Sequence, residues 1–278
     1  HYYERIRTAE ERRDTLTLDM QRWVAATMEA SEGKITSWNL ISNPLSDGGD
    51  VEGYYDLRHQ PEKAGDNEFY WQDYLGSENY GAVVENAARQ SFAASGGNAA
   101  ELKLYVTESG LDNDEDDNHK LASLIYWVGQ WENHGAKIDG LGTQLHLTYY
   151  QDSDVMASKA AHVVKMLHMM ADTKKLVRIS ELDMTYVNAD GTAVKPAELT
   201  AEQQKNMADY YRFVIQMYLK IVPAAQQGGI CMASLADTSG SPVGLWTQAW
   251  ERKQAYAAVC EALSQPLPTT EDFFEYIK

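Results

Sequence analysis

Apolar and polar positions follow two different periods along the chain, one typical of strands and the other of amphipathic helices. Thr8 and Glu11 form a capping box, and apolar residues then recur at helical spacing as far as Met28. Elsewhere, short apolar runs alternate with longer segments of helical periodicity. We predict strands at 34–41, 102–106, 141–147, 176–180 and 229–235, and helices at 77–92, 119–133, 154–172, 201–221 and 253–263.

The order of these elements predicts the fold class. Strands that alternate with helices of this length indicate βα units around a parallel sheet, and no glycine-rich phosphate-binding sequence follows any of them. Polar residues gather just after the predicted strands, where a (β/α)8 barrel keeps its active site. They are Asn43, Glu108, His146 and Glu181. We therefore predict an α/β chain of the (β/α)8 TIM-barrel type, although five units are too few to close such a barrel.

The charge balance narrows the class of partner. The 278 residues include 41 Asp and Glu but only 24 Lys and Arg, a formal charge of −17, which argues against nucleic acid and anionic membranes. No apolar run approaches the roughly 20 residues of a membrane span, and the opening residues have no signal-peptide pattern. Cys231 and Cys260 fit neither a disulfide framework nor a metal motif, so we expect no metal and no cofactor.

The aromatic residues favour a carbohydrate ligand. Seven Trp and 17 Tyr stand against only 5 Phe, and the two enriched types combine a flat apolar face with a hydrogen-bonding edge that suits sugar rings. Packing in the core and at its rim explains the same composition equally well.

Glu181 is the strongest candidate for chemistry. A carboxylate at the end of a buried strand can act as a nucleophile or a base, whereas the structural alternative is an ion pair with Arg178. His146 could orient that carboxylate or bind a sugar hydroxyl, and the alternative is a hydrogen-bonded core histidine. Retaining glycosidases need a second carboxyl about 5–5.5 Å away, to protonate the leaving group.

Five segments of the chain, in their order and spacing, resemble a known family. They are SWNLISNPLSDGG, KLYVTESGL, IDGLGTQLHLTY, LVRISELDMTYV and KQAYAAVCEAL, between Trp38 and about Leu263. They resemble glycoside hydrolase family 10, the retaining β-1,4-xylanases. The resemblance implies a (β/α)8 barrel in which this chain supplies strands four to eight. Residues 1–264 would then form a barrel that lacks its first three strands, and 265–278 a C-terminal tail.

The resemblance also implies roles for individual residues. Glu181 matches the catalytic nucleophile, His146 the histidine beside it, and Gln144 the glutamine two residues earlier. Trp38 and Trp246 are assigned to substrate binding together with Gln144 and His146. We expect Gln144, His146 and Glu181 to converge with the fourth strand's terminal residue on one cleft.

That terminal residue is where the chain departs from the family. The family's fourth strand ends in Asn-Glu, its Glu being the general acid/base, but this chain has Ser42 and Asn43. The family's Asn-Asp-Tyr-Asn after strand five is Thr-Glu-Ser-Gly here, and Ala233 replaces a sugar-covering tryptophan. An amide cannot supply a proton at neutral pH, so Asn43 cannot act as the acid.

These departures predict a xylan-type β-glycan-binding pseudo-enzyme of polysaccharide utilisation. One alternative is an active retaining endo-β-1,4-glycanase whose acid/base has moved to Glu108 or Asp47. Another is a non-catalytic scaffold subunit of a glycan-import assembly. The expected partners are a β-linked polysaccharide or oligosaccharide, the three missing strands from an upstream segment or another chain, and an import complex. The expected location is extracellular or at a bacterial cell surface.

Overall fold

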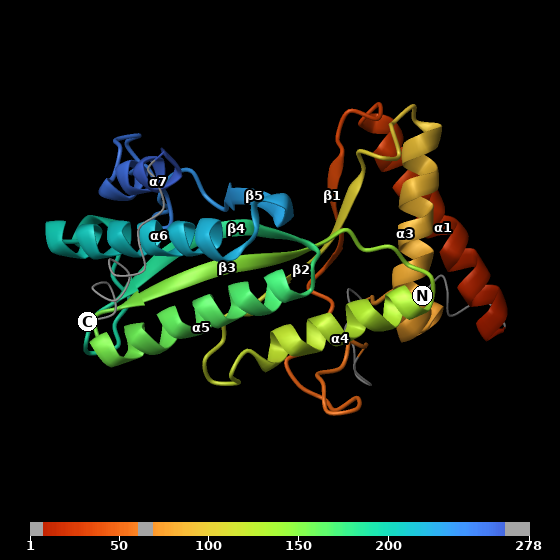
Figure 1. The fold of residues 1–278 in the computed structure, drawn as a ribbon, viewed down its shortest axis with the longest axis horizontal. Helices are drawn as coiled ribbons and strands as arrows, with labels where there is room; N and C mark the ends of the chain where they lie inside the picture. Colours follow the sequence, from red (N-terminus) through yellow and green to blue (C-terminus); the bar gives the residue numbers. More distant parts are fainter. Residues whose placement is uncertain (1–7, 61–68, 265–278) are drawn as a thin grey trace. The chain divides into compact units, whose positions relative to one another are not determined.

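The computed structural model of the protein describes residues 8–60 and 69–264, and the predicted tail at 265–278 lies outside them. The described chain is an α/β fold with five parallel strands (Figure 1). All five predicted strands are confirmed as elements, with small differences at most of their ends. They are β1 (Ser37–Ser42), β2 (Lys103–Ser109), β3 (Gly140–Tyr150), β4 (Leu176–Val187) and β5 (Gln227–Met232).

The predicted helices are confirmed as well, whereas the short elements were not foreseen. The first helix begins at its capping box, because the Thr8 hydroxyl accepts from the Glu11 N–H at 3.1 Å and the Thr8 N–H donates to the Glu11 carboxylate. The helices are α1 (Ala9–Ala30), α2 (Gln72–Leu75), α3 (Ser77–Ala94), α4 (His119–Asn133), α5 (Ser153–Asp172), α6 (Ala201–Ile221) and α7 (Gln254–Ser264). Short 3-10 turns, η2 (Pro196–Glu198) and η3 (Ala224–Gln226), flank α6.

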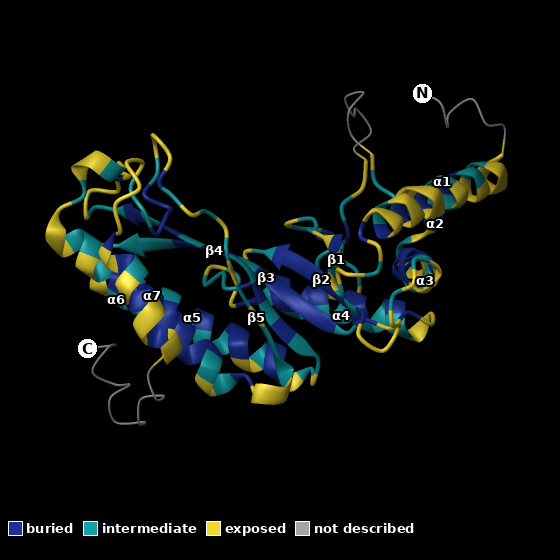
Figure 2. Ribbon diagram, turned by 90° about the horizontal axis from the view of Figure 1, so that it is seen from above, coloured by how far each residue is buried: buried dark blue, intermediate teal, exposed yellow. Residues whose placement is uncertain are grey.

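The chain divides into two compact units, and the first comprises His1–Glu108 and Ala122–Leu141. In it β1 and β2 pair in parallel, with Ser42 opposite Thr107. β2 is buried at five of its seven residues, whereas β1 has one buried residue, Ile41. Helices α1 and α3 lie side by side, and the outer face of α1 is exposed along its length (Figures 1 and 2). The buried residues of this unit therefore come from β2 and from the inner faces of α1 and α3.

The second unit comprises Ser109–Leu121 and Gly142–Lys278. It contains most of β3 together with β4 and β5, and these strands follow one another in sequence order. Helices α5 and α6 pack against β4, and α7 packs on α6 (Figure 1). The assignment of residues 1–264 to a single barrel domain stays a prediction.

β4 is longer than the sequence predicted. We expected this strand to end at Ser180, which was wrong, because buried residues continue to alternate through Met184 and Tyr186. Glu181 therefore lies inside the strand rather than after it. The alternation changes phase at Ser180 and Glu181, and pairing with β5 shifts register between Ile179 and Leu182. Such an irregularity, of which a β-bulge is one form, turns a side chain in a new direction.

Within residues 8–60 and 69–264, none of the helices has the length and apolar character needed to span a bilayer.

Candidate active site

Four polar side chains, called the polar ladder below, join β3 to β4 in the second unit: Gln144, His146, Glu181 and Asp183. Gln144 Nε2 donates to Glu181 Oε1 at 3.1 Å, and His146 Nε2 lies 3.4 Å from Glu181 Oε2. His146 Nδ1 lies 2.9 Å from Oδ1 of Asp183. Side chains two residues apart on a strand share a face, so the pairs Gln144/His146 and Glu181/Asp183 match rung by rung. The structure thus brings three of the predicted site residues together.

The side chains of this cluster differ in how exposed they are to solvent. The side chains of Glu181 and His146 are 40% and 48% exposed, whereas Asp183 is only 13% exposed. Glu181 is therefore accessible to a ligand while two neighbours from β3 hold it in place. The Asp183 carboxylate, which is largely covered, contacts Nδ1 of the His146 ring.

The Asp183 carboxylate favours one tautomer of the histidine. A carboxylate only accepts hydrogen bonds, and the contact with Asp183, at 2.9 Å, is shorter than the 3.4 Å contact with Glu181, so a neutral ring is best satisfied with its proton on Nδ1. With a second proton, on Nε2, the ring donates toward Glu181 as well. The sequence analysis missed this role for Asp183, although its spacing from Glu181 mirrors the spacing of Gln144 from His146.

Asn43 lies in the other unit and has neighbours of its own. It follows β1 with a φ of 49°, a left-handed conformation that asparagine tolerates better than most residues. Its N–H donates to Thr107 O at 2.8 Å, and the Thr107 hydroxyl donates to Ser42 Oγ at 3.2 Å. The amide oxygen of Asn43 is buried and has no hydrogen-bond partner within the described part of the chain. Such an oxygen costs roughly 1–3 kcal/mol.

Glu108 has a structural contact that the sequence did not reveal. Its side chain is completely buried, and Oε2 accepts from the Leu45 N–H at 2.9 Å. The carboxylate thereby fixes the start of the long loop after β1. The same loop is held further along by Ser123, whose hydroxyl accepts from the Tyr55 N–H, and by Trp127, whose indole donates to Tyr55 O.

The two predicted sugar-binding tryptophans have packing partners of their own. The Trp38 indole donates to Ile35 O at 2.7 Å, near the start of β1. It lies five residues before Asn43, or about 16 Å along an extended strand. Trp246, after β5, has its ring centroid 4.9 Å from that of Tyr256 on α7. The structure does not bring Trp38 beside Asn43.

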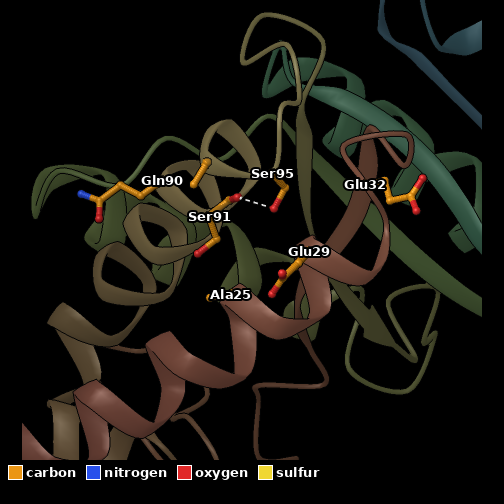
Figure 3. Close-up of a pocket in the computed structure, with 7 residues that line it drawn as sticks. Ala25, Glu29, Glu32, Gln90, Ser91 and Ser95 are labelled. Carbon is orange, nitrogen blue, oxygen red and sulfur yellow. Dashed lines mark hydrogen bonds between the residues drawn. The ribbon is translucent and has the colours of Figure 1, made fainter.

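A pocket of about 550 Å³ lies between α1 and α3 in the first unit (Figure 3). Glu29, Gln90 and Ser91 line it, and the Ser95 hydroxyl donates to Ser91 O. The Glu32 carboxylate points away from Glu29 and pairs with Lys34. This pocket has none of the ladder residues in its wall. Among the described residues, no group of His, Cys, Asp and Glu is arranged to hold a metal ion.

An accessible carboxylate that an imidazole and an amide hold on the strands of an α/β fold is one of the two carboxyl groups that glycoside hydrolysis uses. Comparison with known families gives the same class: the model of glycosyl hydrolase family 10 matches residues 4–262. The chain belongs to glycosyl hydrolase family 10, the xylanase family.

Curated relatives and solved structures agree with this membership. The chain is 26% identical over 268 residues to endo-1,4-beta-xylanase A of Cellvibrio japonicus, covering 88% of this chain and 40% of that protein. It is 27% identical over 175 residues to endo-1,4-beta-xylanase 2 of Claviceps purpurea, covering 62% and 43%. A family 10 structure from Paenibacillus barcinonensis matches with a TM-score of 0.69 at 19% identity, covering 95% of this chain and 71% of that one.

The extent of these matches is itself a finding. The chain spans less than half the length of those two curated relatives. Xylanase B of Clostridium stercorarium F9 matches with a TM-score of 0.68 at 19% identity, and 90% of this chain covers 68% of it. A mutant of xylanase 10C from Cellvibrio japonicus, solved in complex with xylopentaose, matches with a TM-score of 0.66 at 22% identity, covering 94% of this chain and 50% of that one.

Proposed function

We propose that this chain is the strand-four-to-eight part of a family 10 barrel that binds xylan-type β-glycans and hydrolyses them very slowly. Asn43 carries the proposal. It stands where the resemblance places the general acid/base, and its amide has no proton to give at neutral pH. General acid catalysis typically contributes about 10²–10⁴-fold, so its loss leaves a poor catalyst.

The β3–β4 ladder supports retention of the nucleophile and of glycan contacts. Glu181 is accessible and is held by Gln144 and His146, so a sugar at this face meets an anion, an amide and an imidazole. Such groups bind sugar hydroxyls in the ground state without any proton transfer to a leaving group. The ligand we propose is a β-linked xylo-oligosaccharide or xylan chain.

Glu108 is a poor substitute for the missing acid. A general acid must reach the leaving-group oxygen, and Glu108 is completely buried with one oxygen accepting from the Leu45 N–H. This contact disfavours an active glycanase whose acid has moved to the neighbouring strand. An extracellular or bacterial cell-surface location, in a system that captures polysaccharide, is part of the same proposal.

The deciding experiment uses the native polypeptide that carries these residues, with xylan and other β-glycans as substrates. We expect xylopentaose to bind measurably by calorimetry while turnover of xylan stays far below about 1 per second. Turnover in the ordinary range of about 1–10³ per second would contradict the proposal. Absence of both binding and turnover would also contradict it and would favour a scaffold role. Glu181→Gln is the matched control for any residual hydrolysis.

A further inference from the structure

The loop between β5 and α7, residues 233–253, is held as a fixed arm of the second unit (Figure 1). It begins beside β4, because the Ala233 N–H donates to Leu182 O at 3.0 Å. A buried ion pair joins its two ends, in which Lys253 Nζ lies 2.7 Å from Oδ1 of Asp237. The loop is therefore a firm support for the side chains that it carries.

Two half-exposed aromatic rings and an exposed guanidinium meet at the end of this loop. The ring centroids of Trp246 and of Tyr256 on α7 are 4.9 Å apart, and Arg252 Cζ lies 4.7 Å from the centroid of Tyr256. Trp246 and Arg252 are also joined by an antiparallel β-bridge. The three side chains therefore form one surface cluster.

The charge of Arg252 is not neutralised by a neighbour. Among the residues that the structure describes, no carboxylate forms an ion pair with Arg252, not even the adjacent Glu251. Arg212 on α6, by contrast, is paired with both Asp209 and Glu261. In a chain with 41 acidic and 24 basic residues, an exposed guanidinium without a carboxylate is a site of contrary charge. Its fork of donors remains available to an anionic ligand.

Trp250 adds an exposed aromatic face to the same loop. It is 68% exposed, and its φ of 62° lies in the left-handed region, which bulky residues rarely adopt. Its N–H donates to Thr247 O at 3.0 Å, which closes the turn. An exposed ring gains little packing in return for this strain, and backbone strain of that kind concentrates at ligand sites.

We propose that Trp246, Trp250 and Arg252 form a surface site for an acidic sugar, a uronic acid carried by a β-linked glycan. The guanidinium binds the sugar carboxylate through the two parallel hydrogen bonds that its fork allows, and the indole faces cover the sugar ring. An acidic sugar is disfavoured beside Glu181, because both groups are carboxylates. The inference rests on the proposed function for one point, that the ligand is a β-linked glycan.

Calorimetric titration of the native protein with two glycans tests the proposal. The probes are neutral xylopentaose and a xylo-oligosaccharide of the same length that carries a glucuronic acid side group. The net charge of −17 by itself would weaken the binding of the acidic probe. We expect the acidic probe instead to bind about fivefold more tightly than xylopentaose at low salt, and this preference to shrink as salt is added.

Two variants at exposed positions separate charge from stacking. Arg252→Gln should lower the affinity for the acidic probe to that for xylopentaose. Trp250→Ala should weaken the binding of both probes about fivefold, because stacking on an aromatic face does not depend on the carboxylate. Lys174→Gln is the matched control, since it removes a charge whose side chain is 77% exposed, just before β4 and at the opposite end of the strands. It should leave the preference intact.

Equal affinities of the wild-type protein for the two probes overturn the proposal, as does a preference that survives Arg252→Gln. Unchanged affinities in Trp250→Ala also overturn it. If only the acidic probe binds, and Arg252→Gln abolishes this binding, the surface site is supported while the proposed function, which requires xylopentaose to bind, is contradicted. Binding of xylopentaose without any preference contradicts the surface site alone, and absence of binding by either probe contradicts both.

Discussion

The ring of His146 lies between two carboxylates, with Nδ1 at 2.9 Å from Asp183 and Nε2 at 3.4 Å from Glu181. The two carboxylates are not equivalent, because Asp183 is largely covered and Glu181 is accessible. The contact with Asp183 fixes the ring, and the ring then presents its other nitrogen to the more exposed carboxylate of Glu181.

Asp183→Asn should reverse the tautomer of His146. The carboxamide can donate to Nδ1, which a carboxylate cannot, so the proton of the neutral ring should move to Nε2. Nitrogen NMR shifts of the labelled ring report the tautomer directly. Thr185→Val is the control, because the Thr185 hydroxyl forms a hydrogen bond with the Thr148 hydroxyl at 3.1 Å, between the same two strands. An unchanged tautomer in Asp183→Asn would refute the assignment.

Reaction at Glu181 should depend steeply on the leaving group. An aryl xyloside with an acidic phenol leaves without protonation, so it should react with wild-type protein far faster than xylan does. Restoring a carboxyl by Asn43→Glu should narrow the gap, within the 10²–10⁴-fold that general acids typically contribute. Steady-state rates for a series of aryl xylosides with differently substituted phenols give the dependence of the rate on the acidity of the leaving group. A flat dependence in the wild type would show that an acid is present.

Removal of the Glu108 carboxylate should affect stability rather than turnover. Glu108→Ala leaves the buried Leu45 N–H without its acceptor, which should lower the free energy of unfolding by about 1–3 kcal/mol. Rates on the aryl xyloside should stay within a few-fold of wild type. Denaturant titration and initial rates measure the two effects. A loss of rate of about a hundredfold without loss of stability would instead identify Glu108 as the displaced acid.

Asn43→Gly should stabilise the protein by up to about 1 kcal/mol. Glycine adopts the positive φ at no steric cost and removes a buried oxygen that has no partner among the described residues. Asn43→Val should do the opposite, because a β-branched residue is strained at a φ of 49°. Thermal unfolding of the two variants beside wild type provides the measurement. A destabilised glycine variant would show that the amide has a binding role in the fold.

Acid should weaken the attachment of the loop at 110–118 to α5. Burial raises the pKa of Asp114, but hydrogen bonds from Lys159 and Ser158 outweigh it, so its pKa lies below the ordinary value. A carboxyl with a lowered folded-state pKa stabilises the fold above its unfolded-state pKa, and this contribution is lost as the pH falls through the folded-state value. Unfolding free energy should therefore decline below about pH 4, and less so in Asp114→Asn.

The control for that prediction is Asp172→Asn, since Asp172 is 83% exposed and 3.6 Å from Lys174. The unfolding free energy of Asp172→Asn should decline with acid as much as that of wild type, in urea titrations between about pH 5 and pH 2. Equal slopes for wild type and Asp114→Asn would show that the Lys159 contact does not stabilise the fold.

The sequence predicted the βα order, the helices and three members of the ladder, because hydrophobic period and family motifs are local signals. It did not predict that β4 continues past Glu181, because an irregularity interrupts the alternation that marks a strand. The role of Glu108 was also invisible, since its partner Leu45 is 63 residues away. Both misses concern pairings between distant segments, which no local pattern encodes.

The irregularity at Ser180 and Glu181 makes the direction of the Glu181 side chain depend on how the backbone of β4 pairs. Ile179 pairs with Ile230 and Leu182 with Met232, so β4 has one more residue than β5 between these two pairs. A slip of β4 by one position would exchange the faces of its side chains and turn Glu181 away from Gln144 and His146, without any change of sequence. A chain with β4 in the wrong register would therefore lack this site although every candidate catalytic side chain is still present.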